Sequence, residues 1–378
     1  MTGGLLDRAL APLRCHPTLR PGDRVLAAMS GGVDSSVMAA LLQQAGFEVI
    51  GVSMQLFDKG AAGGSAGKCC TLDDFQDARR VAHQGGFPHY VMDFEAPFRE
   101  TVIEGFIQSY LEGETPSPCI WCNQHLKFSA LLERATSLGA AFVATGHYAA
   151  ITLAGSAWHL RKAHDPGKDQ SYYLFHHTQA TLARTLFPLA HLTKPEVRAL
   201  GAELGLHLAE KAESQEICFV TQDRYDTFIE AEGRDPGRGE GEIRHLDGRV
   251  LGCHRGYWRH TIGQRRGLRI AASEPLYVIR TDPATNTVWV GAEQDLYRRD
   301  LVARELSWVQ GPPSGPLACE ARIRSRAPEA EALVLPLADG RVQVTFSEPQ
   351  RAIAPGQAVV FYREGEVLGG GWIDRRPL

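Results

Sequence analysis

The chain contains 378 residues, of which 44% are hydrophobic and 22% charged, and its formal net charge is −4. This is the composition of an ordinary globular protein with enough chain for two or three domains, and the mild acidity argues against indiscriminate binding to nucleic acid. The apolar runs are too short to cross a membrane and the N-terminus has no secretory pattern, so we expect a cytoplasmic protein without a membrane partner.

The first half of the chain alternates apolar strands with helical periodicity, which is typical of a parallel sheet covered by helices on both faces. The expected strands are 25–29, 49–54, 90–94 and 142–145. The expected helices are 34–44, 73–83, 98–111, 128–138 and 193–204, the last beginning with a capping box of Thr193 and Glu196. The pattern predicts an α/β fold with a doubly wound parallel sheet.

The first expected strand leads into the sequence Ser-Gly-Gly-Val-Asp-Ser at 30–35 and then into a helix. Glycines allow the backbone to approach an anion closely, and N–H groups at the start of a helix attract negative charge. No lysine follows the glycines, as it would in a Walker A loop. The pattern instead resembles the PP-loop of enzymes that cleave ATP between its α and β phosphates. The alternative is a glycine-rich turn used only for packing.

Two stretches of this half lack periodicity. Residues 59–68 are almost all Gly, Ala and Ser, and residues 113–124 contain two prolines, which we expect to keep that stretch out of a helix. Both stretches lie at the carboxyl edge of the expected sheet, where open α/β sheets bind ligands. We therefore expect two loops that are placed to carry ligand-binding or catalytic residues.

Cys119 and Cys122 lie in the second of these loops, and Cys218 follows at the end of the α/β half. Eight cysteines in so long a chain do not make a disulfide scaffold. The three thiols could be ordinary buried side chains, metal ligands or reactive groups in sulfur chemistry. Structural zinc is disfavoured, because no further ligand pair follows nearby and the adjacent Cys69 and Cys70 would chelate one ion poorly.

After about residue 219 the helical periodicity fades, and short strands with turns follow, including a hairpin expected around 281–290. We predict two small mainly-β domains, with boundaries at 1–222, 223–300 and 301–378. Residues 249–269 contain six arginines and no acidic residue, interleaved with aromatic side chains. This pattern suits RNA phosphates and unpaired bases, and makes Arg265 and Arg266 candidate contacts; the alternative is a solvated basic turn.

The chain resembles the bacterial tRNA-specific 2-thiouridylases nearly from end to end. Besides the PP-loop, it carries Pro-Cys-Ile-Trp-Cys-Asn at 118–123, Ala-Thr-Gly-His-Tyr-Ala at 144–149, Gly-Lys-Asp-Gln-Ser-Tyr at 167–172, Ile-Cys-Phe at 217–219, Thr-Ile-Gly-Gln-Arg-Arg-Gly-Leu at 261–268 and Pro-Gly-Gln-Ala-Val-Val-Phe-Tyr at 355–362. That family converts the wobble uridine of certain tRNAs to 2-thiouridine, with ATP, Mg²⁺ and sulfur that arrives as a persulfide from a relay protein or a cysteine desulfurase.

The resemblance also implies roles for individual residues. Cys122 matches the nucleophile and Cys218 the persulfide carrier, and the two can form a disulfide. The positions implied to hold ATP are Ala28, Met29, Ser30, Gly31, Gly32, Val33, Asp34, Ser35, Met54 and Gly146. The positions implied to contact tRNA are Ser117, Pro118 and Cys119 at the target base, and His147, Lys168, Asp169, Gln170, Arg324, Ser325 and Gln357 elsewhere. On the residues alone, His147 could equally be a capped core histidine, and 168–170 a polar turn.

Cys119 departs from the pattern of many relatives, which carry an aspartate at this position. Three cysteines can ligate three irons of a [4Fe–4S] cluster, so Cys119, Cys122 and Cys218 leave a cluster mechanism open beside the persulfide relay. Two other functions are also open. A PP-loop amide ligase would explain the loop but would leave the cysteines without a role, and a non-catalytic RNA-binding or iron–sulfur protein would release no AMP.

Overall fold

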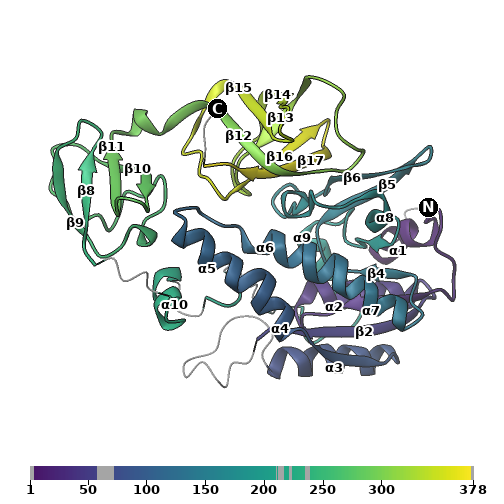
Figure 1. Cartoon of the computed structure of the whole chain (residues 1–378). Helices are drawn as coiled ribbons and strands as arrows, with labels where there is room; N and C mark the ends of the chain where they lie inside the picture. The colour runs from purple at the N-terminus through teal and green to yellow at the C-terminus, as the bar shows by residue number, and fades with distance from the viewer. Residues whose placement is uncertain are drawn as a thin grey trace.

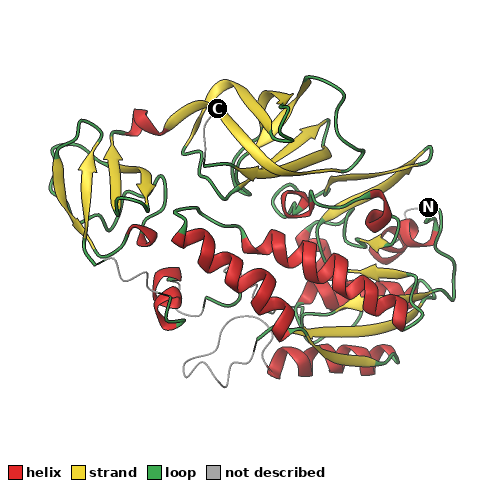
Figure 2. Cartoon of the chain, viewed as in Figure 1, coloured by secondary structure: helices red, strands yellow, loops and turns green. Residues whose placement is uncertain are grey.

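The computed structural model describes residues 4–57, 72–209, 211, 217–220, 224–234 and 239–375. The loop expected at 59–68 and the pair Cys69 and Cys70 lie outside these residues. Helices gather in the N-terminal half, and the rest of the chain forms two β-rich units that lie side by side above it (Figures 1 and 2). The fold class predicted from the sequence is confirmed.

The N-terminal half is built on a parallel sheet with the strand order β3-β2-β1-β4-β7. Its strands are β1 Arg24–Ala28, β2 Glu48–Gln55, β3 His89–Asp93, β4 Phe142–Ala144 and β7 Thr185–Leu186. Successive side chains of β1 point to opposite faces, so Val25 and Ala27 join one hydrophobic core and Leu26 joins the other. Both cores are covered by helices, which makes the sheet doubly wound. The four predicted strands are confirmed to within one residue at each end.

Helices α1, α2, α3 and α9 cover one face, and the segments around α5 and α7 cover the other (Figure 1). The helices of this half are α1 Leu5–Arg14, α2 Val33–Gln44, α3 Leu72–Gly85, α4 Glu95–Phe98, η1 Arg99–Ile103, α5 Glu104–Leu111, α6 Pro118–Trp121, η2 Cys122–Ala130, α7 Leu131–Ser137, η3 Ser171–Leu174, α8 Gln179–Leu182 and α9 Lys194–Glu203. The predicted capping box of α9 is present, with Glu196 accepting from the Thr193 N–H at 2.8 Å. Among the described residues, no helix is both long and apolar enough to cross a membrane.

The prediction that 113–124 is irregular is wrong from Pro118 onward. Segments α6, η2 and α7 form one continuous helix that begins at Pro118. A proline is tolerated at the first helical position, because the N–H group that it lacks has no partner within the helix there. Ile120 and Leu126 of this helix are both buried in the same hydrophobic core, and this burial stabilises the helix.

The β-rich part consists of a four-stranded sheet and a barrel. The sheet contains β8 Gly241–His245, β9 Val250–His254, β10 Tyr277–Asp282 and β11 Thr287–Gly291, and β10 and β11 form the predicted hairpin. The barrel contains β12 Tyr297–Trp308, β13 Leu317–Arg322, β14 Ala330–Pro336, β15 Val342–Arg351, β16 Ala358–Arg363 and β17 Glu366–Ile373, and the pairing of β12 with β17 closes it. The short helix α10 Tyr225–Ala231 precedes the sheet, η4 Tyr257–Arg259 lies between β9 and β10, and η5 Glu293–Leu296 connects the sheet to the barrel.

A hairpin of the N-terminal half also joins the barrel. It consists of β5 Ala149–Ala154 and β6 Ala157–Lys162, which the sequence analysis does not predict. Strand β6 pairs with β17 where Arg161 lies opposite Glu366. The α/β half and the barrel are therefore connected by backbone pairing as well as by side chains.

Candidate active site

The segment 28–35, predicted to hold ATP, forms the turn between β1 and α2. Gly31 has a φ of +73°, and a Cβ atom there would lie 2.3 Å from the carbonyl oxygen of Asp74, so only glycine fits without strain. The Ser35 hydroxyl accepts from the Ser30 N–H and donates to the Gly32 carbonyl, both at 3.1 Å. Helix α2 begins without a side-chain cap. The N–H groups of its first turn therefore form the kind of anion site that a phosphate occupies.

Gly146 and Met54, also predicted to contact ATP, lie at the same edge of the sheet. Gly146 follows β4, and a Cβ atom there would lie 2.9 Å from the backbone nitrogen of Ser35. Met54 lies on β2, two residues beyond Val52, which pairs with Ala28 at the end of β1. The carboxyl ends of neighbouring parallel strands are where open α/β sheets bind ligands. The structure thus brings together all the positions predicted to hold ATP.

Two lysines that the sequence analysis does not single out also contact this turn. The Lys194 ammonium, at the start of α9, lies 2.7 Å from both carboxylate oxygens of Asp34, and the Tyr148 hydroxyl donates to Asp34 at 2.8 Å. The Lys211 ammonium donates to the Gly31 carbonyl at 2.9 Å and pairs with two aspartates of α3. These lysines lie 160 and 180 residues from their partners in the turn, so no local pattern could reveal them.

Cys119 and Cys122 lie in the first turns of the helix that begins at Pro118. Ser117, predicted with Pro118 and Cys119 to meet the target base, is the N-cap residue of this helix. The Cys119 side chain is exposed, whereas Cys122 is 9% exposed and begins the π-helical segment η2. Such π-helical turns are rare and occur frequently at functional sites. The predicted nucleophile and the predicted base contacts therefore share one helix start.

Cys218 is half-buried in the short segment 217–220. The next residue, Phe219, is 4% exposed, and its ring centroid lies 5.1 Å from that of Phe106 and 5.3 Å from that of Phe228. Cys122 and Cys218 both pack on the same hydrophobic core. Within the ranges that the structure describes, no three His, Cys, Asp or Glu side chains are grouped to hold a metal ion. Cys119, Cys122 and Cys218 accordingly form no such group among these residues.

Gln357, predicted to contact tRNA, binds the loop that precedes the cysteine helix. Its amide donates to the Thr115 carbonyl at 2.8 Å, and the Thr115 N–H donates to the Pro355 carbonyl at 2.8 Å. Arg304 of the barrel forms an ion pair with Glu114 at 3.1 Å. Burial raises the pKa of Glu114, and the charge of Arg304 opposes that rise. The barrel therefore fixes the shape of this loop.

The predicted tRNA contacts at 168–170 form a turn between the PP-loop and the barrel. Lys168 donates its N–H to the Asp165 carbonyl at 3.1 Å. Asp169 accepts from the Ser171 hydroxyl at 2.8 Å and lies 3.5 Å from Arg322 of the barrel. The Gln170 side chain accepts from the Tyr148 N–H at 2.9 Å. These bonds hold the turn in one conformation next to Tyr148, a partner of Asp34.

His147 is buried, and its ring lies 2.7 Å from the Thr145 hydroxyl. Phe128 contacts His147 and two further buried histidines, His176 and His177, with ring centroids 4.4 to 6.2 Å apart. Burial lowers the pKa of His147 well below its usual value. His147 is therefore neutral at neutral pH and forms part of a buried histidine cluster.

Arg324 and Ser325, two further predicted tRNA contacts, lie after β13. Arg324 donates to the Ala352 carbonyl at 2.6 Å. Ser325 forms a hydrogen bond with Tyr173, and burial raises the pKa of that phenol, with a smaller contribution from the neighbouring Cys119. Ser325 of the barrel therefore lies near the start of the cysteine helix.

The basic stretch 249–269 covers β9, η4 and the loop that follows. Some of its arginines are engaged: Arg259 pairs with Asp226 at 3.0 Å, and Arg249 pairs with Asp247 at 2.8 Å. Arg265 and Arg266 are exposed in the loop. They remain candidates for contact with a phosphate backbone.

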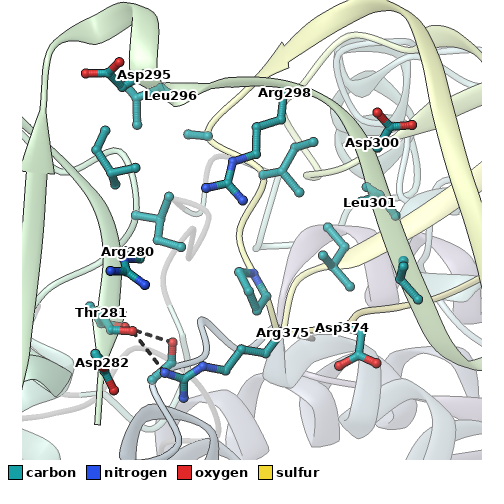
Figure 3. A pocket seen from close by; sticks show the side chains of 18 residues that line it. Arg280, Thr281, Asp282, Asp295, Leu296, Arg298, Asp300, Leu301, Asp374 and Arg375 are labelled. Atoms are coloured by element: carbon teal, nitrogen blue, oxygen red, sulfur yellow. Dashed lines mark hydrogen bonds between the residues drawn. The ribbon is translucent and has the colours of Figure 1, made fainter. Parts of the chain in front are cut away.

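A cavity of about 400 Å³ lies between the four-stranded sheet and the barrel (Figure 3), and no residue of the 28–35 turn lines it. Arginines and aspartates from both units line it, among them Arg280, Arg298 and Asp300. Arg375 crosses its lower rim and donates to the Thr281 carbonyl at 3.0 Å. None of the predicted site residues lines this cavity.

Comparison with known proteins gives matches along nearly the whole chain. Three family models match consecutive segments: the tRNA methyl transferase HUP domain at 23–222, the tRNA methyl transferase PRC-barrel domain at 227–292 and the aminomethyltransferase beta-barrel domain at 298–373. The tRNA-specific 2-thiouridylase MnmA of Geobacter metallireducens is 51% identical over 356 residues, which are 93% of this chain and 96% of that protein. The protein of the same name from Geotalea uraniireducens is 50% identical, over 93% of this chain and 95% of its own length.

Proposed function

Because the chain belongs to the tRNA-specific 2-thiouridylase family, we propose that it converts the wobble uridine of tRNA to 2-thiouridine. The reaction adenylates the C2 carbonyl oxygen with ATP, transfers sulfur from a cysteine persulfide, and releases AMP and pyrophosphate. The observation that carries this proposal is the 51% identity to the Geobacter protein over 93% of the chain. The gathering of the predicted ATP positions at one sheet edge supports it.

In the first step, the phosphates of ATP bind at the 28–35 turn, and the C2 carbonyl oxygen of the uracil attacks the α phosphate. The N–H groups at the start of α2 stabilise the departing pyrophosphate. Mg²⁺ would neutralise charge on the phosphates, and the carboxylate of Asp34, whose side chain is 30% exposed, is the hard oxygen ligand that this ion prefers. Adenylation gives C2 a good leaving group, AMP.

In the second step, a persulfide on Cys218 attacks C2 through its terminal sulfur, and AMP leaves with the electrons of the C–O bond. The Cys122 thiolate then attacks the inner sulfur of Cys218. The sulfur–sulfur bond breaks toward the uridine, which leaves 2-thiouridine and a disulfide between the two cysteines. A thiol reductant restores the thiols, and a relay protein or a cysteine desulfurase supplies the next persulfide.

The target base must leave the anticodon stack to reach these residues, because a stacked base cannot enter an enclosed site. We propose that the flipped base meets Ser117, Pro118 and Cys119 at the start of the cysteine helix. We also propose that the exposed Arg265 and Arg266 contact phosphates of the tRNA, and that the reaction takes place in the cytoplasm.

The test uses purified protein, ATP, Mg²⁺, tRNA and a persulfide donor. Thiolated nucleoside and AMP should form in equal amounts, and both should depend on tRNA. Asp34→Ala should abolish both products while circular dichroism shows an intact fold. The absence of 2-thiouridine with wild-type protein would contradict the proposal, and AMP formation that does not need tRNA would favour an amide ligase.

A further inference from the structure

We propose that Lys194 is the phosphate-binding cation of the nucleotide site, and that Asp34 and Tyr148 hold its ammonium in place until ATP arrives. The inference rests on the proposed function, because it assumes that ATP binds at the 28–35 turn. It assigns a role to a residue that lies far from that turn along the chain.

The turn itself carries no positive side chain. The sequence from Ser30 to Phe47 contains neither lysine nor arginine. The triphosphate of ATP carries several negative charges, and N–H groups at a helix start supply only a partial charge of about +0.5. Any full positive charge that the protein itself adds beside Mg²⁺ must therefore come from elsewhere in the fold.

Lys194 is placed to supply that charge. It is 7% exposed, although lysine is among the residues least often buried. Its ammonium reaches both oxygens of Asp34, a residue of the turn, at 2.7 Å. The Asp34 side chain is itself 30% exposed, so the pair lies at the border of the site and not deep within a core.

Further bonds hold Lys194 and Tyr148 in position. The backbone N–H of Lys194 donates to the Asp165 carboxylate at 2.9 Å, and the backbone N–H of Tyr148 donates to the Gln170 side chain at 2.9 Å. The turn that contains Asp165 and Gln170 thus fixes both partners of Asp34. Groups held by such supporting contacts meet a ligand at a small entropic cost.

Lys211, the other lysine at the turn, is less suited to this role. It pairs with Asp74 at 2.8 Å and Asp77 at 2.7 Å and also binds the Gly31 carbonyl. The negative charges of these two carboxylates exceed the single positive charge of Lys211, so Lys211 presents no net positive charge to a phosphate. Its role is to link α3 to the turn. The Lys194 ammonium pairs instead with the carboxylate of Asp34. Asp34 would hold Mg²⁺ when the nucleotide is bound, and the Lys194 ammonium would then pair with a phosphate oxygen.

A purely structural interpretation is that the ion pair only joins α9 to α2. The two interpretations predict different affinities of the Lys194 variant for inorganic pyrophosphate, measured with EDTA present so that no metal ion contributes. If Lys194 binds phosphate, Lys194→Met should weaken pyrophosphate binding about 10- to 100-fold in calorimetry, as expected for the loss of a charged hydrogen-bond donor. Asp34→Asn should bind at least as tightly as wild type under these conditions, and the double variant should be as weak as Lys194→Met.

Lys162→Met is the matched control, because Lys162 forms a partly buried ion pair with Glu329 that joins β6 to the barrel. It should leave pyrophosphate binding unchanged. If Lys194→Met does not fold, Lys194→Gln replaces it. Wild-type affinity in Lys194→Met, or in the double variant, would overturn the inference and leave the proposed function intact. Failure of the wild-type protein to bind either pyrophosphate or ATP would overturn both.

Discussion

Cys119 is exposed at the start of a helix, three residues before the buried Cys122. In the proposed relay, Cys119 is a spare thiol near the base, so Cys119→Asp should keep most of the thiolation activity. In a cluster enzyme it is an iron ligand, and the same change should remove activity, because a carboxylate suits iron–sulfur clusters poorly. The two mechanisms are distinguished by the amount of thiolated nucleoside that wild-type and Cys119→Asp proteins form when both are prepared without oxygen.

Cys122→Ser and Cys218→Ser complete this comparison. Each should abolish thiolation and leave tRNA affinity unchanged, because thiolates perform the chemistry while phosphate contacts dominate binding. Cys253→Ser is the control, since Cys253 is exposed on β9, outside the cysteine helix and the 217–220 segment. An inactive Cys119→Asp protein together with about four irons per active wild-type chain would contradict the relay.

The buried histidines predict sensitivity to acid. Burial lowers the pKa of His177 to about 3 and that of His176 well below its usual value. Because these pKa values lie below those of the unfolded chain, the stabilisation is fully present above about pH 6.5 and is lost as the pH falls toward 3, by up to about 1.4 kcal/mol per pH unit for each histidine.

The free energy of unfolding, measured with urea between pH 7 and pH 5, should therefore fall steeply. His177→Gln should reduce the slope by about one proton, because it removes one buried group that must become charged on unfolding. His83, at the exposed end of α3, provides the control, and His83→Gln should keep the wild-type slope. Equal slopes in all three proteins would contradict this account.

At the scale of elements, the contact between the end of β4 and the start of α2 depends on Gly146. Gly146→Ala should place a methyl group 2.9 Å from the backbone nitrogen of Ser35, which cannot move without distorting the PP-loop. We expect a loss of stability of about 1–3 kcal/mol and at least a tenfold weaker binding of ATP. Thermal unfolding and calorimetry measure the two effects.

Gly105→Ala is the control for this prediction. A Cβ atom at Gly105 of α5 would meet Trp121 at 3.4 Å, an ordinary contact, and alanine favours the helix. Stability should therefore be kept or increased, with ATP affinity unchanged. If Gly146→Ala behaves in the same way, Gly146 is not needed for the close approach of the two elements.

The elements that the sequence predicts well depend on local patterns. The strands and helices of the α/β half follow from the period of their apolar residues, and the α9 capping box follows from Thr193 and Glu196. The two prolines at 116 and 118 do not reveal the cysteine helix, because proline disfavours a helix at most positions, whereas Pro118 occupies the first helical position, where it is tolerated. Hairpin β5–β6 and Lys194 could not be predicted, since only long-range packing brings β6 to β17 or Lys194 to Asp34.

At the scale of the whole molecule, tRNA binding should depend on the exposed arginines of the central β unit. The double variant Arg265→Ala, Arg266→Ala should bind tRNA more weakly, and its affinity should depend less on salt. Each phosphate contact that is lost reduces the number of counterions released when tRNA binds. Affinity at several salt concentrations gives the slope, which should fall by about one to two. Arg134→Ala on α7, in the α/β half, is the control and should leave the salt dependence of tRNA affinity unchanged. An unchanged salt dependence in the double variant would indicate that the loop with Arg265 and Arg266 is only a solvated basic turn.

The bond from Gln357 to the Thr115 carbonyl has a consequence for synthesis of the protein. Its two residues lie 242 positions apart in the chain. At about 5–20 residues per second, the ribosome needs on the order of ten seconds or more to synthesise the segment between Thr115 and Gln357. During that time the residues of the PP-loop and the cysteine helix have already been made, but the loop before the helix has no barrel to hold it. A nascent chain thus carries Cys119 and Cys122 before the barrel can hold the loop that precedes them.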